Sequence, residues 1–245
     1  MDAGRGPDAV LSRITVVAET GSTNADLLGA AGQVADGAWL VAERQLAGRG
    51  REGRAWASPA GNLYASTLLR LRPSDPPAPG IALVAAVALH ATLTRWLPEP
   101  SALRLKWPND LLLDGAKLAG ILLERQADAV VAGFGVNLAH HPAGLDRAVT
   151  HLGEHAVAPA PLAVVEALAG ALDAWLVRWR AEGLAPVRDA WLARAHALGT
   201  TLSAALPEGG RGEGVFDGLA DDGALRLRLA DGTVRVIHAG DVFLL

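Results

Sequence analysis

The 245-residue chain contains no cysteine, which excludes disulfide bonds, zinc–thiolate sites and a cysteine nucleophile. Aromatic residues make up only 4% of a chain that is 51% hydrophobic, so the core is expected to consist mainly of Leu, Val and Ala. Charge of neither sign dominates. The formal net charge of −4 argues against a protein that binds nucleic acid over its whole surface, and any anion site must therefore be local.

Long hydrophobic runs are also missing. The first ten residues, MDAGRGPDAV, contain no continuous apolar stretch, so residues 1–11 are expected to be disordered and not to form a secretory signal. The most apolar segment, residues 81–93, is short, rich in alanine and interrupted by His90, which is typical of a core helix. We therefore expect a cytoplasmic protein without membrane association.

Lysine is nearly absent. It occurs only at Lys106 and Lys117, whereas the other twenty basic residues are arginine. Lysine is a compact point charge that can approach one oxygen closely, whereas arginine presents a planar fork. The two lysines flank Asn109 and Asp110, and this arrangement predicts an oxyanion site. The structural alternative is a buried ion pair between Asp110 and Lys117, brought together by a tight turn at residues 114–115.

The hydrophobic periodicity predicts an α+β fold with a mixed, mainly antiparallel sheet. Seven segments have the pattern of strands: 14–18, 39–43, 63–71, 103–105, 110–113, 118–124 and 130–136. The last four are expected to form one antiparallel meander, with Asp114-Gly115 as a hairpin turn. Four segments have the pattern of helices: 22–31, capped by Ser22, then 81–96, 161–181 and 186–197.

The pattern changes after Gly199. Short alternating runs are separated by turn sequences such as Asp221-Asp-Gly and Asp231-Gly, which are strong hairpin signals. This pattern predicts a small C-terminal β-barrel at residues 200–245, which follows a larger domain at residues 1–199.

A glycine-rich loop carries three arginines. Residues 48–53 have the GxGxxG spacing, but no helix is expected to begin at the third glycine, and the Gly-Lys-Ser/Thr of a Walker loop is absent. Arg49, Arg51 and Arg54 repel one another, so we expect the loop to stay mobile until an anion neutralises it. A solvated basic loop is the alternative.

Other polar groups lie at the ends of expected elements. Thr23 and Asn24 add hydrogen-bonding groups that capping does not require. In residues 106–110, Pro108 ends a strand, and the amide and carboxylate after it can bind a metal ion or orient a nucleophile. The two glycines in residues 133–137 suit either close contact of the backbone with a flat ligand or a β-bulge.

Four histidines lie in or next to a predicted loop, His140, His141, His151 and His155. The sequence places no carboxylate as a clear partner for them. We therefore expect solvated loop histidines and no metal cluster.

Five segments, in order, resemble the motifs of biotin–protein ligases: STN at 22–24, QLAGRGREGRAWASPAGNLYAS at 45–66, KWPND at 106–110, KLAGILLE at 117–124 and GFGVNL at 133–138. The resemblance extends from about residue 12 to the C-terminus. It implies a class II synthetase-like catalytic domain that binds biotin and ATP at residues 1–199, followed by the small β-barrel. Because only about ten residues precede the first expected strand, we expect neither the DNA-binding domain of some members nor repressor function.

The resemblance implies a two-step reaction. The biotin carboxylate attacks the α-phosphate of ATP to give biotinyl-5′-AMP and pyrophosphate, and a lysine of a biotin carboxyl carrier domain of an acyl-CoA carboxylase then displaces AMP. Mg²⁺ is expected to accompany ATP, and Asp110 either binds this metal or orients the acceptor amine. Lipoate–protein ligase and a non-catalytic biotin-binding sensor are the alternatives. Whether the protein is a monomer or a homodimer stays open.

The matching motifs imply roles for individual residues. The catalytic residues are expected to be Lys117, Asp110 and Arg51. The biotin-binding residues are expected to be Ser22, Thr23, Asn24, Gln45, Arg49, Gly50, Arg51, Trp56, Lys117 and Gly120. The ATP-binding residues are expected to be Arg49, Arg51, Arg54, Lys106, Asn109 and Asn137. The arginine loop is expected to close over the adenylate and to exclude water.

Overall fold

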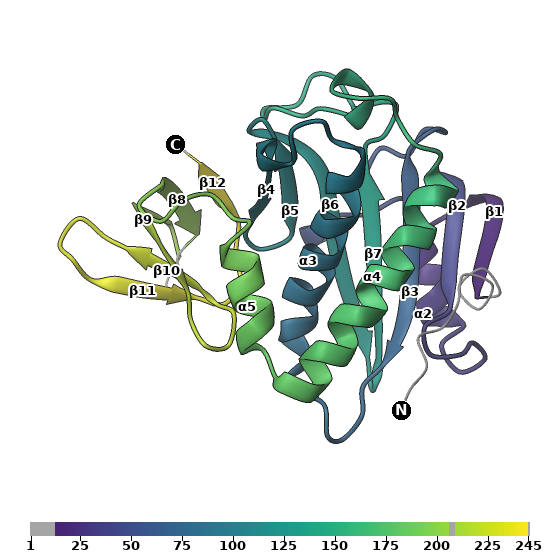
Figure 1. Cartoon of the computed structure of the whole chain (residues 1–245), viewed down its shortest axis with the longest axis horizontal. Helices are drawn as coiled ribbons and strands as arrows, with labels where there is room; N and C mark the ends of the chain where they lie inside the picture. Colours follow the sequence, from purple (N-terminus) through teal and green to yellow (C-terminus); the bar gives the residue numbers. More distant parts are fainter. Residues whose placement is uncertain (1–12, 206–208, 245) are drawn as a thin grey trace.

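The computed structural model describes residues 13–205 and 209–244 (Figure 1). The expected disorder of residues 1–11 therefore lies outside the described residues. The described strands form two sheets: a seven-stranded sheet in the order β1-β2-β3-β7-β6-β5-β4 and a five-stranded sheet in the order β11-β10-β9-β8-β12.

The large sheet is mixed and mainly antiparallel, as predicted. Only the pairing of its first two strands is parallel. Its strands are β1 (Ile14–Thr20), β2 (Trp39–Gln45), β3 (Leu63–Arg70), β4 (Leu103–Lys106), β5 (Asp110–Leu113), β6 (Ala116–Gln126) and β7 (Ala129–Val136). Strands β4 to β7 form the expected meander. Asp114 and Gly115 have φ angles of 50° and 81°, the left-handed backbone that a two-residue hairpin turn of this type requires.

Helices cover both faces of the large sheet. They are α2 (Thr23–Gly29), α3 (Ile81–Leu93), α4 (Pro161–Glu182) and α5 (Ala185–Leu192). Helices α3 and α4 lie across one face (Figure 1), whereas α2 packs on the other, where Leu27 joins Leu68 and Val131 in a separate apolar cluster. The segment Ala78–Trp96 is long and apolar enough to span a membrane, but 67% of its most apolar window is buried inside the structure, as in a core helix.

Helix α5 ends at Leu192, so the predicted end at residue 197 is wrong. The backbone N–H of Leu105 donates to the carbonyl of Arg194 at 2.9 Å, and Ala195 pairs with Leu105 as a parallel bridge. This segment therefore extends along the edge strand β4 of the large sheet. The helix therefore ends because this segment pairs with strand β4, and not because of a local sequence signal.

The C-terminal region is a small antiparallel sheet, which agrees with the predicted hairpins, but no closed β-barrel is seen among the described residues. Its strands are β8 (Thr201–Ala205), β9 (Arg211–Leu219), β10 (Leu225–Arg228), β11 (Val234–Ile237) and β12 (Val242–Leu244). Strands β11 and β12 are the two edges, so the sheet is open within residues 201–205 and 209–244. Helix α5 lies between the two sheets (Figure 1), with Trp191 edge-on to Phe216 at a centroid distance of 6.3 Å. A domain boundary near residue 200 stays a prediction.

Candidate active site

A cavity of about 380 Å³ lies where the motifs meet. Its walls come from the start of α2, the arginine loop, strands β4 to β7, the segment 146–148 and the last strand of the small sheet. Of the residues predicted from the motifs, Asn137 does not line this cavity, and the others do: Ser22, Thr23, Asn24, Gln45, Arg49, Gly50, Arg51, Arg54, Trp56, Lys106, Asn109, Asp110, Lys117 and Gly120. Their individual roles stay predictions.

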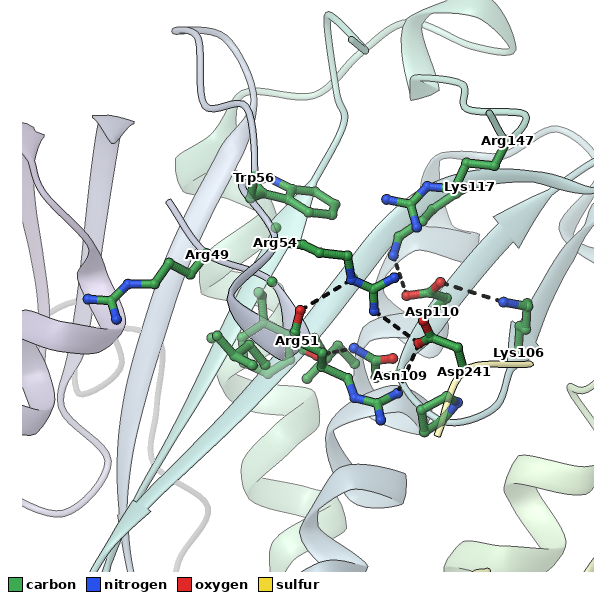
Figure 2. Close-up of a pocket in the computed structure, with 18 of the residues that line it drawn as sticks. Arg49, Arg51, Arg54, Trp56, Lys106, Asn109, Asp110, Lys117, Arg147 and Asp241 are labelled. Carbon is green, nitrogen blue, oxygen red and sulfur yellow. Dashed lines mark hydrogen bonds and ion pairs between the residues drawn. The ribbon is translucent and has the colours of Figure 1, made fainter. Parts of the chain in front are cut away.

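An ammonium–carboxylate pair lines the cavity. Nζ of Lys117 contacts Oδ1 of Asp110, and Nζ of Lys106 lies 3.9 Å from the other carboxylate oxygen, Oδ2 (Figure 2). The pairing of β5 with β6 holds Asp110 opposite Gly120, and a register shift between Leu111 and Leu112 lies next to it. The ion pair that the sequence left as the structural alternative is therefore present, and it lies in the wall of the cavity.

Burial lowers the pKa of both lysines. The pKa of Lys117 is lowered mainly by desolvation, which outweighs the opposing charge and hydrogen bond of Asp110. The pKa of Lys106 is lowered by the same cause, again against the charge of Asp110. An anion that entered the cavity would favour the charged form of both ammonium groups.

At three positions in the large sheet, a glycine lets a side chain from elsewhere lie close to the strand backbone. A Cβ at Gly135 would lie 2.6 Å from the Trp56 ring, and a Cβ at Gly120 would lie 3.1 Å from the same ring. A Cβ at Gly133 would lie 2.1 Å from Oδ1 of Asn24. Strand β7 pairs with both neighbours without a register shift, so the β-bulge interpretation is wrong. The close approach comes from Trp56 and Asn24 themselves.

Amides, hydroxyls and one carboxylate form a hydrogen-bonded network, here called the amide end of the cavity: Thr23, Asn24, Gln45, Ser66 and Glu124. Thr23, Asn24 and Ser66 are buried, and Gln45 and Glu124 are half-buried. The Thr23 N–H donates to Oε1 of Gln45 at 2.9 Å, and its hydroxyl lies 2.7 Å from that of Ser66. The Ser66 hydroxyl donates to Oδ1 of Asn24 at 2.6 Å, and the Asn24 amide donates to Glu124 at 2.8 Å. Ser22 caps α2, as predicted, through a long hydrogen bond of 3.5 Å from the Ala25 N–H.

The arginine loop reaches the small sheet at the other end, here called the charged end: Arg51, Arg54, Lys106 and Asp241 (Figure 2). Arg54 donates to Oδ1 of Asp241 at 2.9 Å, and Arg51 donates to the carbonyl of Gly240 at 3.1 Å. Burial raises the pKa of Asp241, but the hydrogen bond and charge of Arg54 outweigh it, so the net shift is downward. A carboxylate thus lies among cations that could hold the phosphates of a ligand.

Two comparisons decide which family has this arrangement. Residues 20–138 match the Biotin/lipoate A/B protein ligase family, and residues 204–245 match the Biotin protein ligase C terminal domain. The biotin--[acetyl-CoA-carboxylase] ligase of Paracoccus denitrificans is 40% identical over 239 residues, which cover 93% of this chain and 99% of that protein. The chain belongs to the biotin protein ligase family.

Other relatives agree. The enzyme of the same name from Mycobacterium tuberculosis is 38% identical, over 94% of this chain and 88% of its own. Among solved structures, the biotin protein ligase from Aquifex aeolicus in complex with biotin and ATP has a TM-score of 0.84 at 24% identity and covers 95% of this chain and 99% of its own. That likeness shows the fold alone.

The biotin protein ligase fold brings in three charged residues that the sequence did not single out, and Asp146 is one of them. Arg147 lines the cavity next to Lys117 (Figure 2), and Asp241 reaches it from the small sheet. The backbone N–H of Lys117 donates to the backbone carbonyl of Ala148 at 2.9 Å. This bond holds the segment that contains Arg147 alongside β6. None of the three residues lies in a motif, so only the tertiary structure identifies them.

Three of the residues predicted to bind ligand, Asn137, Asn109 and Arg49, do not point toward the ammonium–carboxylate pair or are bonded to the protein backbone. The Asn137 amide donates to the carbonyl of Thr150 at 3.0 Å, and the residue lines a neighbouring cavity of about 510 Å³ that it shares with Lys117 and Arg147. The Asn109 amide donates to the carbonyl of Ile121 at 2.6 Å, which fixes the start of β5 against β6. Arg49 lines the main cavity but points away from the ammonium–carboxylate pair (Figure 2).

The histidines of the loop do have carboxylate partners, so that part of the sequence interpretation is wrong. Nε2 of His141 lies 3.2 Å from Glu154, and Nδ1 of His155 lies 3.4 Å from Asp114. His141 and Glu154 are thirteen positions apart in a loop without periodicity, and the fold of that loop brings them together.

Proposed function

We propose that the protein is an ATP-dependent biotin–protein ligase that forms biotinyl-5′-AMP and transfers biotin to a lysine of a biotin carboxyl carrier domain. One observation carries the proposal: the ammonium of Lys117, paired with Asp110, lines the same cavity as residues of the amide end and of the charged end. A ligand that spans the cavity would place its ureido ring at the amide end and its nucleotide at the charged end. Its carboxylate and the α-phosphate would then meet at Lys117.

The first step joins two anions, and their mutual repulsion must be offset. A carboxylate oxygen of biotin attacks the α-phosphorus of ATP, and pyrophosphate leaves with the electrons of the broken P–O bond. Lys117 supplies a point charge at the forming bond, and Arg51 and Arg54 supply charge for the phosphates. Arg147 lies next to Lys117 and is proposed to hold pyrophosphate.

The second step needs a neutral amine. A free lysine titrates near 10.4, so the acceptor must lose a proton before it attacks the carbonyl carbon of the mixed anhydride and expels AMP. Asp110 faces the cavity and is the nearest carboxylate to Lys117, so we propose that it orients the acceptor amine. Trp56 and the arginine loop cover the site and are proposed to exclude water from the hydrolysable adenylate.

Mg²⁺ is proposed to enter with ATP, bound through its phosphates. Asp110 does not fit as a metal ligand in this structure, because one carboxylate oxygen contacts Lys117 and the other faces Lys106 at 3.9 Å. No step above depends on a metal held by the protein.

The proposal is tested with purified protein, ATP, Mg²⁺, biotin and a biotin carboxyl carrier domain. We expect a gain of one biotinyl group on the carrier, read by mass spectrometry, with equimolar AMP and pyrophosphate. A second reaction with lipoate in place of biotin separates the two ligases of this wider family. Transfer of lipoate without biotin contradicts the proposal, and so does tight binding of biotin without release of pyrophosphate.

A further inference from the structure

A cluster of two histidines and one glutamate lies in the loop that follows β7. Nε2 of His141 lies 3.2 Å from Oε1 of Glu154, and Nδ1 of His151 lies 3.6 Å from the same oxygen. One ligand atom from each residue lies within 4.8 Å of the other two. Ligand atoms around a tetrahedral zinc ion are separated by about 3.3 Å, given bonds of about 2.0–2.1 Å. A small inward movement would therefore bring the three groups to bonding distance.

The proton positions favour a cation between these groups. Nδ1 of His141 lies 3.2 Å from the carbonyl oxygen of Pro142, and Nε2 of the same ring lies 3.2 Å from Oε1 of Glu154. Both oxygens can only accept, and a neutral imidazole can donate to only one of them. Nδ1 of His151 is buried and has no hydrogen-bond partner among the described residues, and its 3.6 Å distance from Glu154 exceeds hydrogen-bond reach. A cation between Nε2 of His141, Nδ1 of His151 and Oε1 of Glu154 would give all three atoms a common partner, including the nitrogen of His151 that has none among the described residues.

A second layer of contacts holds the carboxylate in place. The Thr150 hydroxyl donates to Oε2 of Glu154 at 2.5 Å, so Oε1 is left facing the two histidines. Nε2 of His155 lies 2.9 Å from the same hydroxyl. Outer hydrogen bonds of this kind, including the one from His141 to Pro142, orient the ligands of a metal site.

We propose that His141, His151 and Glu154 bind one divalent transition-metal ion of the zinc class. Two imidazoles and a carboxylate suit such an ion, with a further position open to water. The cluster lies next to the active site but contributes no side chain to the main cavity. The Thr150 N–H donates to the carbonyl of Lys117 at 3.0 Å, so an ion would fasten the loop that backs Lys117 and carries Arg147. The site itself does not depend on the proposed ligase activity.

The experiment uses the full chain without a histidine tag, treated with a chelator and dialysed. Zn²⁺ is titrated by calorimetry, and Co²⁺ by visible absorption, which reports the coordination geometry. We expect one ion per chain and a rise in the melting temperature on addition of Zn²⁺. Glu154→Gln and His151→Ala are each expected to weaken binding at least tenfold and to abolish the thermal shift.

Two histidine variants serve as matched controls. His140→Ala removes the neighbouring ring of the same loop, and His238→Ala removes a histidine of the small sheet that is 69% exposed. Both are expected to bind Zn²⁺ like the wild type, and circular dichroism checks that every variant is folded. Three outcomes overturn the proposal: no saturable binding of one ion; equal binding by wild type and Glu154→Gln, which would mean an adventitious ion only; or a His141 imidazolium paired with Glu154, seen by NMR titration, that Zn²⁺ does not displace.

Discussion

The amide end and the charged end of the cavity are built in different ways. At the amide end, side chains from the start of α2 and from β2, β3 and β6 bond to one another within one sheet and its helix. At the charged end, Arg51 and Arg54 from a glycine-rich loop bond to residues of the other sheet. The amide end is therefore preorganised, whereas the charged end is held by ionic contacts that ligand phosphates can replace.

Replacing Lys117 should have the largest effect, because its ammonium lines the cavity beside Asp110 and the Trp56 ring. We expect Lys117→Ala to slow adenylation by about 100-fold or more, since a charge in a water-excluded site acts on the developing transition state. Biotin affinity should fall less. Lys117→Arg should also be impaired, because a planar fork cannot replace a point charge. Isotope exchange between pyrophosphate and ATP measures the rate, and calorimetry measures biotin affinity.

The control for this prediction concerns stability. Removal of one partner of a buried ion pair can cost roughly 3–5 kcal/mol, and here Asp110 would keep only Lys106, 3.9 Å away, as a partner. The double variant Lys117→Met/Asp110→Asn removes both charges and should recover stability without recovering adenylation. A wild-type exchange rate in Lys117→Arg would contradict the role assigned to the ammonium.

Gly133→Ala should damage the amide end alone. A Cβ at this position would lie 2.1 Å from Oδ1 of Asn24, so the network of Asn24, Ser66 and Thr23 must shift. We expect biotin affinity to fall at least tenfold in calorimetry, with ATP affinity unchanged. Gly170→Ala in α4 is the matched control, because a Cβ there meets no atom within 4 Å. Equal losses of biotin and ATP affinity would show that the two ends are not independent.

The sequence predicted best those features that local signals encode. Ser22 caps a helix, and Asp114-Gly115 makes the turn that brings Lys117 beside Asp110. The role of the glycines of β7 could not be predicted, because it depends on Asn24 and Trp56, which are far away in the sequence. A glycine pattern indicates that another group lies close to the backbone, but it does not identify the side chain or ligand.

Long-range contacts explain the other differences. Helix α5 ends early because residues 194–195 pair with Leu105, and no residue near Leu192 signals that end. Asp241 is one acidic residue among many in the sequence, and it becomes part of the site only because the small sheet packs against the arginine loop. The motifs thus locate the amide end almost completely, whereas the charged end depends on how two sheets meet.

Asp241→Asn should change the charged end by a smaller amount. Asparagine keeps an oxygen for the hydrogen bond from Arg54 but removes the negative charge that competes with phosphates. We expect the KM for ATP to fall severalfold at low salt, and the difference to shrink as salt screens the charges. The KM for biotin should not change. A rise in the KM for ATP would show that Asp241 positions the arginines and does not compete with the ligand.

The smallest effect is expected from a change of pH. It acts on the contact between the two sheets, and the charged end depends on that contact. His196 packs on Phe216 at a centroid distance of 4.7 Å, and desolvation lowers its pKa from 6.5 to about 4. Between pH 6.5 and 4, His196 therefore binds a proton in the unfolded chain but not in the folded chain. The free energy of unfolding falls as the pH falls through this window. The loss from this histidine is at most about 3 kcal/mol by pH 4.

His196→Phe keeps a ring against Phe216 and removes the titrating group. We expect its free energy of unfolding in urea to fall less than that of the wild type between pH 7.5 and 5. Burial also lowers the pKa of His90 to about 4, so His90 supplies a common background in both proteins. In the wild type, the KM for ATP should rise on acidification before biotin affinity falls, because only the charged end depends on the second sheet. An identical pH dependence in His196→Phe would assign the acid loss to the core of the large sheet, and the contrast between the two ends would then not extend to their stability.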